Sequence, residues 1–175
     1  EETNKDEMLR EVMDAIMLWR EQIGQTIKPL EAAKEIEWLL PVKNPIVKIH
    51  GVIDLITQDN VIVDDKAASR KASPESSLQM AAYTDWFLQH TGRLPEAVVF
   101  HTLVRRKSGP TIEITSYKPD ETYCSRFRER ALQVCKMLEA QIYILPELSS
   151  WVCSEKYCDY YNICEHSKGG QHAEI

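Results

Sequence analysis

The sequence predicts an α/β domain in which a central sheet of about five strands is flanked by helices. Two observations support this fold class. Apolar residues recur at helical spacing in three segments, near residues 6–24, 74–90 and 121–143, a pattern typical of helices that bury one face. Five shorter segments between them are rich in valine, isoleucine and threonine and end at turn-forming residues, which is typical of strands. The predicted order is helix, three strands, helix, two strands, helix, and a cysteine-bearing tail.

The first four elements follow from residue spacing and turn signals. Leu9, Val12 and Ile16 stand three, four or seven residues apart, which places them on one face of the first helix. Strands are predicted at 34–42 and 46–56, with the turn-like KNP between them, and at 60–66 after the polar link TQDN.

The elements in the second half of the chain are predicted from the same kinds of signal. Ser73 and Pro74 are predicted to be the N-cap and first residue of the second helix. Asp120 is predicted to open the last helix. The two remaining strands are predicted at 96–106 and 111–118, separated by SGP. Neither a repeat nor a linker divides the chain, so we expect a core of residues 1–148 with a cysteine-containing extension, 149–175, packed on the same domain.

Length and composition are those of a globular protein. The chain has 175 residues, of which 43% are hydrophobic and 27% charged, enough to bury a core. No apolar run reaches the roughly 20 residues of a membrane span, and no secretory signal is visible, so a cytoplasmic location is expected. The net charge of −6 argues weakly against nucleic acid as partner, because phosphate contacts need local positive charge. Lys66, Arg70 and Lys71 could supply such charge beside a metal site.

Acidic residues and a lysine interrupt the second and third predicted strands. Residues two apart in a strand share a face, so Asp64 and Lys66 point to one side and Asp65 to the other. A short link would bring Asp54 beside Asp64 across the pair of strands. Two facing carboxylates repel unless a cation lies between them, and carboxylates suit Mg²⁺ or Mn²⁺. Lys66 could orient or deprotonate an attacking water, or stabilise charge on a phosphoryl oxygen. This chemistry fits metal-assisted phosphodiester hydrolysis; the alternative is a solvated sheet edge.

Gln79 and Tyr83 lie four residues apart on the next predicted helix and therefore share a face. Glutamine there could bond to a water or to the lysine. Tyrosine could contact a phosphate or stack on a base.

Three motifs in this order carry a family resemblance: G-x-x-D at 51–54, D-x-K at 64–66 and Q-x-x-x-Y at 79–83. Together they resemble the PD-(D/E)XK nuclease superfamily, and specifically its RecB-like exonucleases, which include phage and CRISPR-associated enzymes. The resemblance covers roughly residues 35–165. It implies a restriction-endonuclease-like core with a mixed sheet in the order α-βββ-α-ββ-α.

The resemblance also implies a role for each matching residue. Asp54 and Asp64 would be metal ligands, with the backbone carbonyl of Asp65 as a third. Lys66 would be the catalytic lysine, Gln79 its positioning partner, and Tyr83 a DNA-facing or site-supporting residue. Arg70 and Lys71 are the further candidates for nucleic-acid contact.

The sequence departs from the family pattern at two places. Relatives often have threonine after the lysine, where this chain has Ala67. Many RecB-like members use a histidine ligand from an N-terminal helix, and no histidine precedes His50 here. His50 shares a strand face with Asp54 and is kept as a substitute, although a structural role is the commoner reading of such a histidine.

The tail places Cys153, Cys158 and Cys164 in C-x₄-C-x₅-C order. Without a secretory signal, such spacing favours metal ligation or free thiols over disulfides. The resemblance implies a remnant of a 4Fe–4S cluster, whose fourth cysteine would lie upstream of Glu1, as would the missing histidine. Alternatively His166 completes a Zn²⁺ site, or the thiols are simply buried.

The sequence is compatible with three functional interpretations. The first is a Mg²⁺- or Mn²⁺-dependent DNA nuclease, an exonuclease acting on ends or single strands, with a helicase, recombination or CRISPR partner and no membrane. The second is a nuclease-fold module that binds DNA or protein without cutting; the intact acidic, lysine and glutamine set argues against it. The third is a cysteine-ligated zinc module, which predicts tightly held zinc and no dependence on Mg²⁺.

Overall fold

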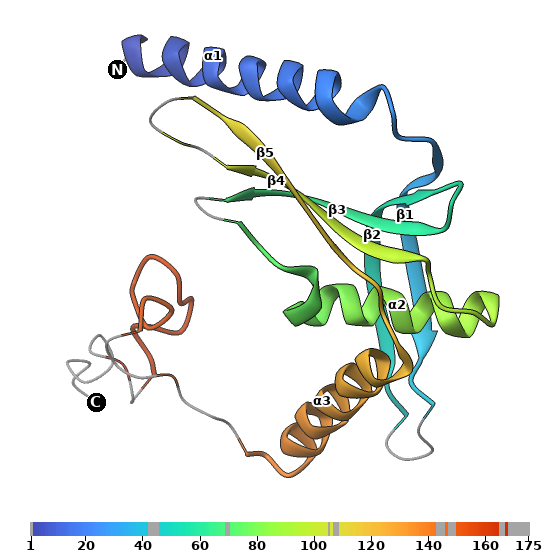
Figure 1. Ribbon diagram of the computed structural model, residues 1–175. Coiled ribbons are helices and arrows are strands. Elements are labelled where there is room, and N and C mark those ends of the chain that lie inside the picture. The colour runs from blue at the N-terminus through green and yellow to red at the C-terminus, as the bar shows by residue number, and fades with distance from the viewer. Residues whose placement is uncertain are drawn as a thin grey trace. The chain divides into compact units, whose positions relative to one another are not determined.

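The computed structural model describes residues 2–41, 46–68, 71–104, 106, 109–142, 146, 150–164 and 167 (Figure 1). It consists of two compact units, Glu1–Gln133 and Val134–Ile175.

The first unit contains the predicted five-stranded mixed sheet, with strands in the spatial order β1-β2-β3-β4-β5. Neighbouring strands run antiparallel except β3 and β4, which are parallel. In that parallel pair Asp65 lies opposite His101. The strands are β1 (Pro29–Leu39), β2 (Lys48–Thr57), β3 (Val61–Ala68), β4 (Ala97–Val104) and β5 (Thr111–Tyr117). The predicted fold class is confirmed.

Helices cover both faces of the sheet in the first unit. The helix α1 (Glu2–Trp19) lies over one face, and its last turn continues as a short π-helix, η1 (Arg20–Gly24); α2 (Leu78–Thr91) lies against the opposite face (Figure 1). The third helix, α3 (Glu121–Glu139), begins in the first unit and ends in the second.

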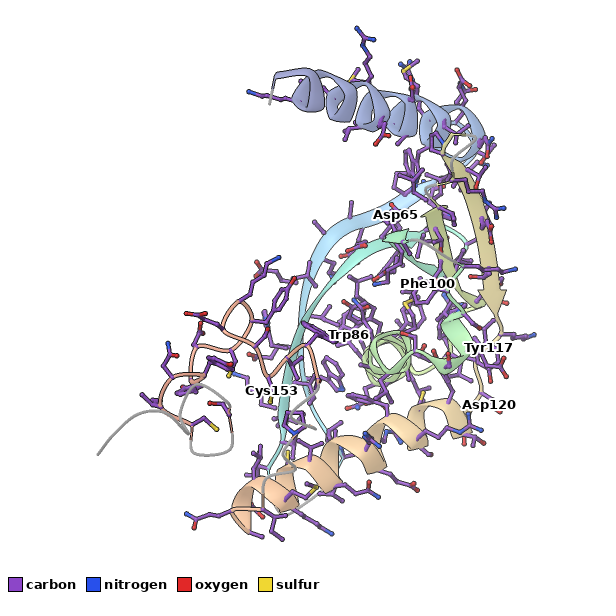
Figure 2. All side chains as sticks on the ribbon, turned by 90° about the vertical axis from the view of Figure 1, so that its left-hand side faces the viewer. Asp65, Trp86, Phe100, Tyr117, Asp120 and Cys153 are labelled. Atoms are coloured by element: carbon purple, nitrogen blue, oxygen red, sulfur yellow. The ribbon has the colours of Figure 1, made fainter. Side chains whose placement is uncertain are left out.

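The core of the first unit lies between the sheet and α2. Ile53, Ile62 and Val98 of the sheet are completely buried, and eight consecutive residues of α2, from 80 to 87, are buried as well. Figure 2 shows Trp86 and Phe100 among the side chains of this layer. Each fully buried isoleucine contributes about 1.5–3 kcal/mol. The buried layer therefore holds α2 firmly behind β2 and β3.

A buried carboxylate, Asp85, joins three elements of the first unit. One of its oxygens accepts hydrogen bonds from Trp38 Nε1 of β1 and from Gln89 Nε2, each at 2.9 Å. The other oxygen accepts from Arg128 Nε of α3 at 2.5 Å. Such a buried pair adds little net stability but makes misplacement of either partner costly. It therefore fixes α2 relative to β1 and the start of α3.

The start of α2 differs from the prediction. Pro74 opens a separate 3₁₀ turn, η2 (Pro74–Ser76), and Ser73 makes no capping bond. Ser77 is the N-cap, because its side chain accepts a hydrogen bond from the Met80 amide at 3.2 Å. At the other end Gly92 adopts φ +74°, the left-handed conformation that glycine takes without strain.

The start of α3 agrees with the prediction. The carboxylate of Asp120 accepts a hydrogen bond from the Tyr123 amide at 2.8 Å, which is the capping geometry expected of an aspartate there. The Tyr123 hydroxyl in turn donates to the carbonyl of Pro74 at 2.5 Å.

The described part of the second unit after α3 is built of short turns. Backbone hydrogen bonds link Cys153 to Ser150 and Cys158 to Ser154. Trp151 and Tyr157 pack edge to face, with ring centroids 5.1 Å apart. No helix in the described ranges is long and apolar enough to cross a membrane.

Candidate active site

The candidate site lies where β2 and β3 separate. Their ladder consists of two residue pairs, Leu55 with Val63 and Ile56 with Ile62. A side chain accepts the next backbone N–H at each end of this ladder. Thr57 Oγ1 accepts from the Val61 amide and Asp54 Oδ2 from the Asp65 amide, both at 3.1 Å. The Asp54 carboxylate thus occupies the fork between the strands, beside the Asp64–Lys66 segment.

Asp64 is the buried acid of the site. Its side chain is 2% exposed, and its Oδ2 lies 2.6 Å from Lys66 Nζ. Although the two groups form a close ion pair, Oδ2 receives no well-formed hydrogen bond from any described residue. Burial raises the pKa of Asp64; the charges of Asp54 and Asp65 add to this, and Lys66 opposes it. Removal of water from a carboxylate disfavours its charged form, so a cation at Oδ2 would relieve the cost.

Lys66 is held by a chain of hydrogen bonds that reaches back to β2. Its ammonium donates to Gln79 Oε1 at 2.8 Å. Gln79 Nε2 donates to the Tyr83 hydroxyl at 3.0 Å, and that hydroxyl donates to the carbonyl of Val52 at 2.5 Å. The structure therefore brings Asp54, Asp64, Lys66 and Gln79 together as the sequence pattern suggests. Tyr83 is 6% exposed, and its geometry favours the site-supporting role.

The structure explains why residue 51, the first position of G-x-x-D, is glycine. A Cβ placed on Gly51 would come within 3.3 Å of Tyr83 Cε1, closer than ordinary van der Waals contact. Glycine therefore allows the tyrosine ring to lie against β2, from where its hydroxyl reaches Val52 and Gln79.

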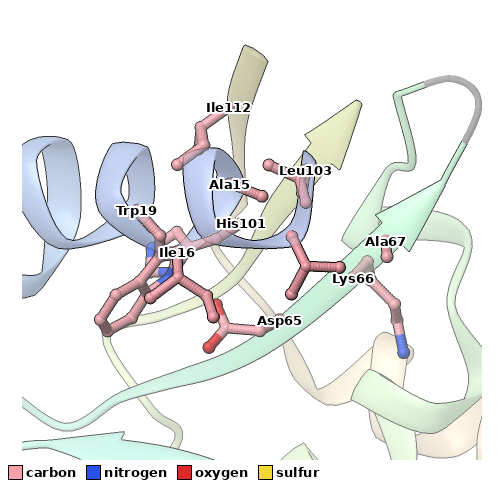
Figure 3. Close-up of a pocket in the computed structure, with 10 residues that line it drawn as sticks. Ala15, Ile16, Trp19, Asp65, Lys66, Ala67, His101, Leu103 and Ile112 are labelled. Carbon is pink, nitrogen blue, oxygen red and sulfur yellow. The ribbon is translucent and has the colours of Figure 1, made fainter. Parts of the chain in front are cut away.

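Asp65 faces the opposite side of the sheet. Its Oδ1 lies 3.0 Å from His101 Nδ1 and 3.3 Å from Trp19 Nε1. Figure 3 shows these three side chains together, with the Lys66 ammonium pointing away from them. They lie in the wall of a pocket of about 500 Å³ between α1 and strands β3–β5. Sequence reasoning missed His101 and Trp19; a histidine within the apolar run VVFHTLV was the available signal.

The oxygen atoms at the fork suit a hard divalent cation. Asp54 and Asp64 offer carboxylates, one with an unsatisfied buried oxygen. In a strand the N–H and C=O of one residue point to the same edge, so the carbonyl of Asp65 lies on the edge where its N–H meets Asp54. Mg²⁺ commonly takes one or two carboxylates and completes its shell with water. No group of three His, Cys, Asp or Glu side chains that could hold a metal ion occurs among the described residues.

The other residues predicted to bind nucleic acid or metal do not join this site among the described residues. Lys71 is exposed after β3, and Arg70 lies outside the described residues. His50 is exposed on β2, opposite Glu37. Cys153, Cys158 and Cys164 are half-buried free thiols that do not gather into a ligand group within the described ranges, so the predicted iron–sulfur or zinc site gains no support. His166 lies outside the described residues.

Cys124 is buried in α3. Burial raises the pKa of its thiol to about 11. A thiol that stays protonated at neutral pH is a poor nucleophile and a poor metal ligand.

A mixed five-stranded sheet between helices, with two carboxylates and a lysine at the separation of two strands, defines the restriction-endonuclease-like class of α/β folds. The chain belongs to the PD-(D/E)XK nuclease superfamily, whose family model matches residues 3–165.

Two solved structures resemble the chain at low sequence identity. A candidate exonuclease from Eubacterium rectale is 12% identical with a TM-score of 0.55, over 95% of this chain and 60% of that protein. The protein SSO0001 is 15% identical with a TM-score of 0.45, over 91% of this chain and 68% of that one. The chain thus spans less than two thirds of the length of the Eubacterium protein. No curated protein matches the sequence.

Proposed function

We propose that the chain is a divalent-metal-dependent DNA nuclease of RecB-like type, an exonuclease acting on ends or single strands during repair, recombination, phage or CRISPR-related processing. The observation that carries the proposal is the convergence of Asp54, Asp64 and Lys66 at one strand fork. Membership of the nuclease superfamily supports hydrolysis of phosphodiester bonds, and the motif order of RecB-like enzymes supports DNA as substrate.

The chain's own residues divide the work of hydrolysis. Asp54, Asp64 and the Asp65 carbonyl would hold Mg²⁺ or Mn²⁺, which when bound acts as a Lewis acid and makes water a better nucleophile. Lys66 lies beside Asp64, where its ammonium can donate to an attacking water or to a phosphoryl oxygen that gains charge. Gln79 Oε1 accepts a hydrogen bond from the Lys66 ammonium, which fixes the direction of the remaining ammonium donors.

The proposal is tested by incubating end-labelled single-stranded, duplex and circular DNA with Mg²⁺ or Mn²⁺. We expect metal-dependent release of short products from free ends, and loss of about 10²–10³-fold in rate for Lys66→Ala, the scale seen when one charge-stabilising donor is removed. Lys118→Ala, at an exposed lysine directly after β5, is the matched control and should cut normally.

Three outcomes bear on separate parts of the proposal. Cutting of circles would contradict the exonuclease assignment, and preferential cutting of RNA would contradict the DNA assignment. A folded wild-type chain that binds DNA but never cuts it would favour the binding-module interpretation.

A further inference from the structure

Asp65 makes contacts on both sides of β3. Its backbone N–H holds the Asp54 carboxylate on the catalytic side, while its own side chain is held from the other side by His101 and Trp19. We propose that His101 and Trp19 are positioning residues, which act through the Asp65 carboxylate to fix the metal-binding groups. This inference rests on the proposed function.

The contacts to the Asp65 carboxylate come from two different elements. His101 is the direct register partner of Asp65 in β4, and it is 7% exposed, whereas the Asp65 side chain is 46% exposed. Trp19 is the last residue of α1. An exposed carboxylate on an unsupported strand can adopt several rotamers. Two donors from separate elements that meet at one oxygen restrict it to a single arrangement.

Such restriction matters because β3 loses one neighbour at this level. The ladder with β2 ends at Leu55 and Val63, whereas pairing with β4 continues to Ala68. Backbone bonds therefore hold the Asp64–Lys66 segment from one edge alone within the described residues. The Asp65 side-chain contacts add a second restraint, perpendicular to the sheet.

The restraint is transmitted through strand geometry. Alternation places Asp64 and Lys66 on the face opposite the Asp65 side chain, so a rotation of residue 65 about the strand axis moves both of them. The same rotation moves the 65 amide away from Asp54. Because carboxylate ligands depend on outer partners for orientation, loss of such a partner commonly lowers metal affinity or activity 10–100-fold.

A residue that lines the apolar pocket can distinguish this positioning role from general packing. Leu103 lies two residues after His101 on β4 and lines the same pocket beneath α1. Its truncation removes apolar contact on this face without removing a donor to Asp65. Leu103→Ala is therefore the matched control for His101 and Trp19 variants.

The test measures Mn²⁺ binding by titration calorimetry, which needs no cutting, on wild type, His101→Phe, His101→Asn, Trp19→Phe and Leu103→Ala. We expect His101→Phe to weaken metal binding about 10–100-fold and Trp19→Phe to weaken it less. His101→Asn, which retains a side-chain donor close to the position of Nδ1, should recover most of the affinity. Leu103→Ala should lower the melting temperature while leaving metal affinity unchanged.

Unchanged affinity in both His101→Phe and Trp19→Phe would overturn the inference while leaving the proposed nuclease intact. An equal loss in Leu103→Ala would also overturn it, because packing alone would then explain the effect. A folded wild type that binds no Mn²⁺ would overturn the metal-dependent function and this inference together. If His101→Phe does not fold, Trp19→Phe at the helix end decides the matter.

Discussion

Asp64 shows how burial and function oppose each other at a single residue. Its carboxylate is buried and close to two other acids, so its pKa is raised. Between the unfolded and folded pKa values the native state binds more protons than the unfolded state, and stability falls as pH rises through that interval. Above it, the ionised carboxylate makes the metal-free fold less stable than the protonated one does.

Asp64→Asn should therefore raise the melting temperature of the metal-free protein at pH 8. The gain should shrink as pH falls below the folded pKa of Asp64, because the wild-type side chain then becomes neutral as well. Thermal unfolding in a chelator across this pH range checks the sign. Added Mg²⁺ should reverse the order, since ligand binding stabilises only the chain that holds it. A less stable Asn variant at pH 8 would contradict this account.

Tyr83 makes a second prediction at the scale of one residue. Tyr83→Phe removes the hydroxyl that links Gln79 to the Val52 carbonyl. We expect a loss of about 1 kcal/mol in stability and a fall of roughly tenfold or more in kcat, because Gln79 no longer holds Lys66 firmly. Tyr117→Phe, on β5, is the control. Unchanged kcat with lowered stability would restrict Tyr83 to packing.

The residues of the catalytic face could be placed from sequence because their positions depend on short-range periodicity. Alternation along β3 put Asp64 beside Lys66, and the helical repeat put Gln79 below Tyr83. The link of residues 58–60 then brought Asp54 to the same fork. His101 could not be placed, because its meeting with Asp65 depends on the register of a parallel pair formed across the whole of α2.

At the scale of elements, the start of α2 decides where Gln79 points. The serine and proline at 73–74 have the sequence signature of a helix start, yet the helix begins four residues later. The carbonyl of Pro74 is bonded to the Tyr123 hydroxyl of α3, and Ser77 takes the capping position. A contact between segments 49 residues apart leaves no local trace in the sequence.

Ser77→Ala should therefore cost about 1 kcal/mol of stability, or roughly 2–4 °C in melting temperature for a chain of this size. Ser73→Ala should change stability by less than about 0.5 kcal/mol, the usual range for surface sites. Thermal unfolding of the two variants in parallel compares them directly. A larger loss at Ser73 would return the helix start to its predicted place.

The strand β1 gives another reason why element bounds are hard to predict. It begins at Pro29, ahead of the predicted residue 34, and includes a register shift between Pro29 and Glu31. Ala33 adopts φ +48°, which disrupts the alternation of side chains that marks a strand. The regular stretch around Ile36 and Trp38, where burial alternates, was the part that could be recognised.

At the scale of the whole molecule, the net charge of −6 sets a limit on unaided DNA binding. Phosphates are repelled by the acidic fork unless a divalent cation neutralises it. The Lys66→Ala chain, which is expected to cut slowly, should therefore bind single-stranded DNA more tightly, by about tenfold or more, with Mg²⁺ than with a chelator. Fluorescence anisotropy at about 150 mM salt, where surface charges are screened beyond roughly 8 Å, makes this comparison. Equal binding without metal would show that other basic surfaces provide the grip.

The fork between β2 and β3 also allows metal binding to be followed at a backbone amide. The Asp65 amide hydrogen is bonded to a side chain, Asp54, in place of a neighbouring strand. Binding of a metal ion to the Asp54 carboxylate would alter the hydrogen bond of this amide. The backbone hydrogen bonds between β2 and β3 would be unchanged. The chemical shift and solvent exchange of the Asp65 amide proton therefore report whether the metal site is occupied. Both can be measured in the absence of DNA and of catalysis.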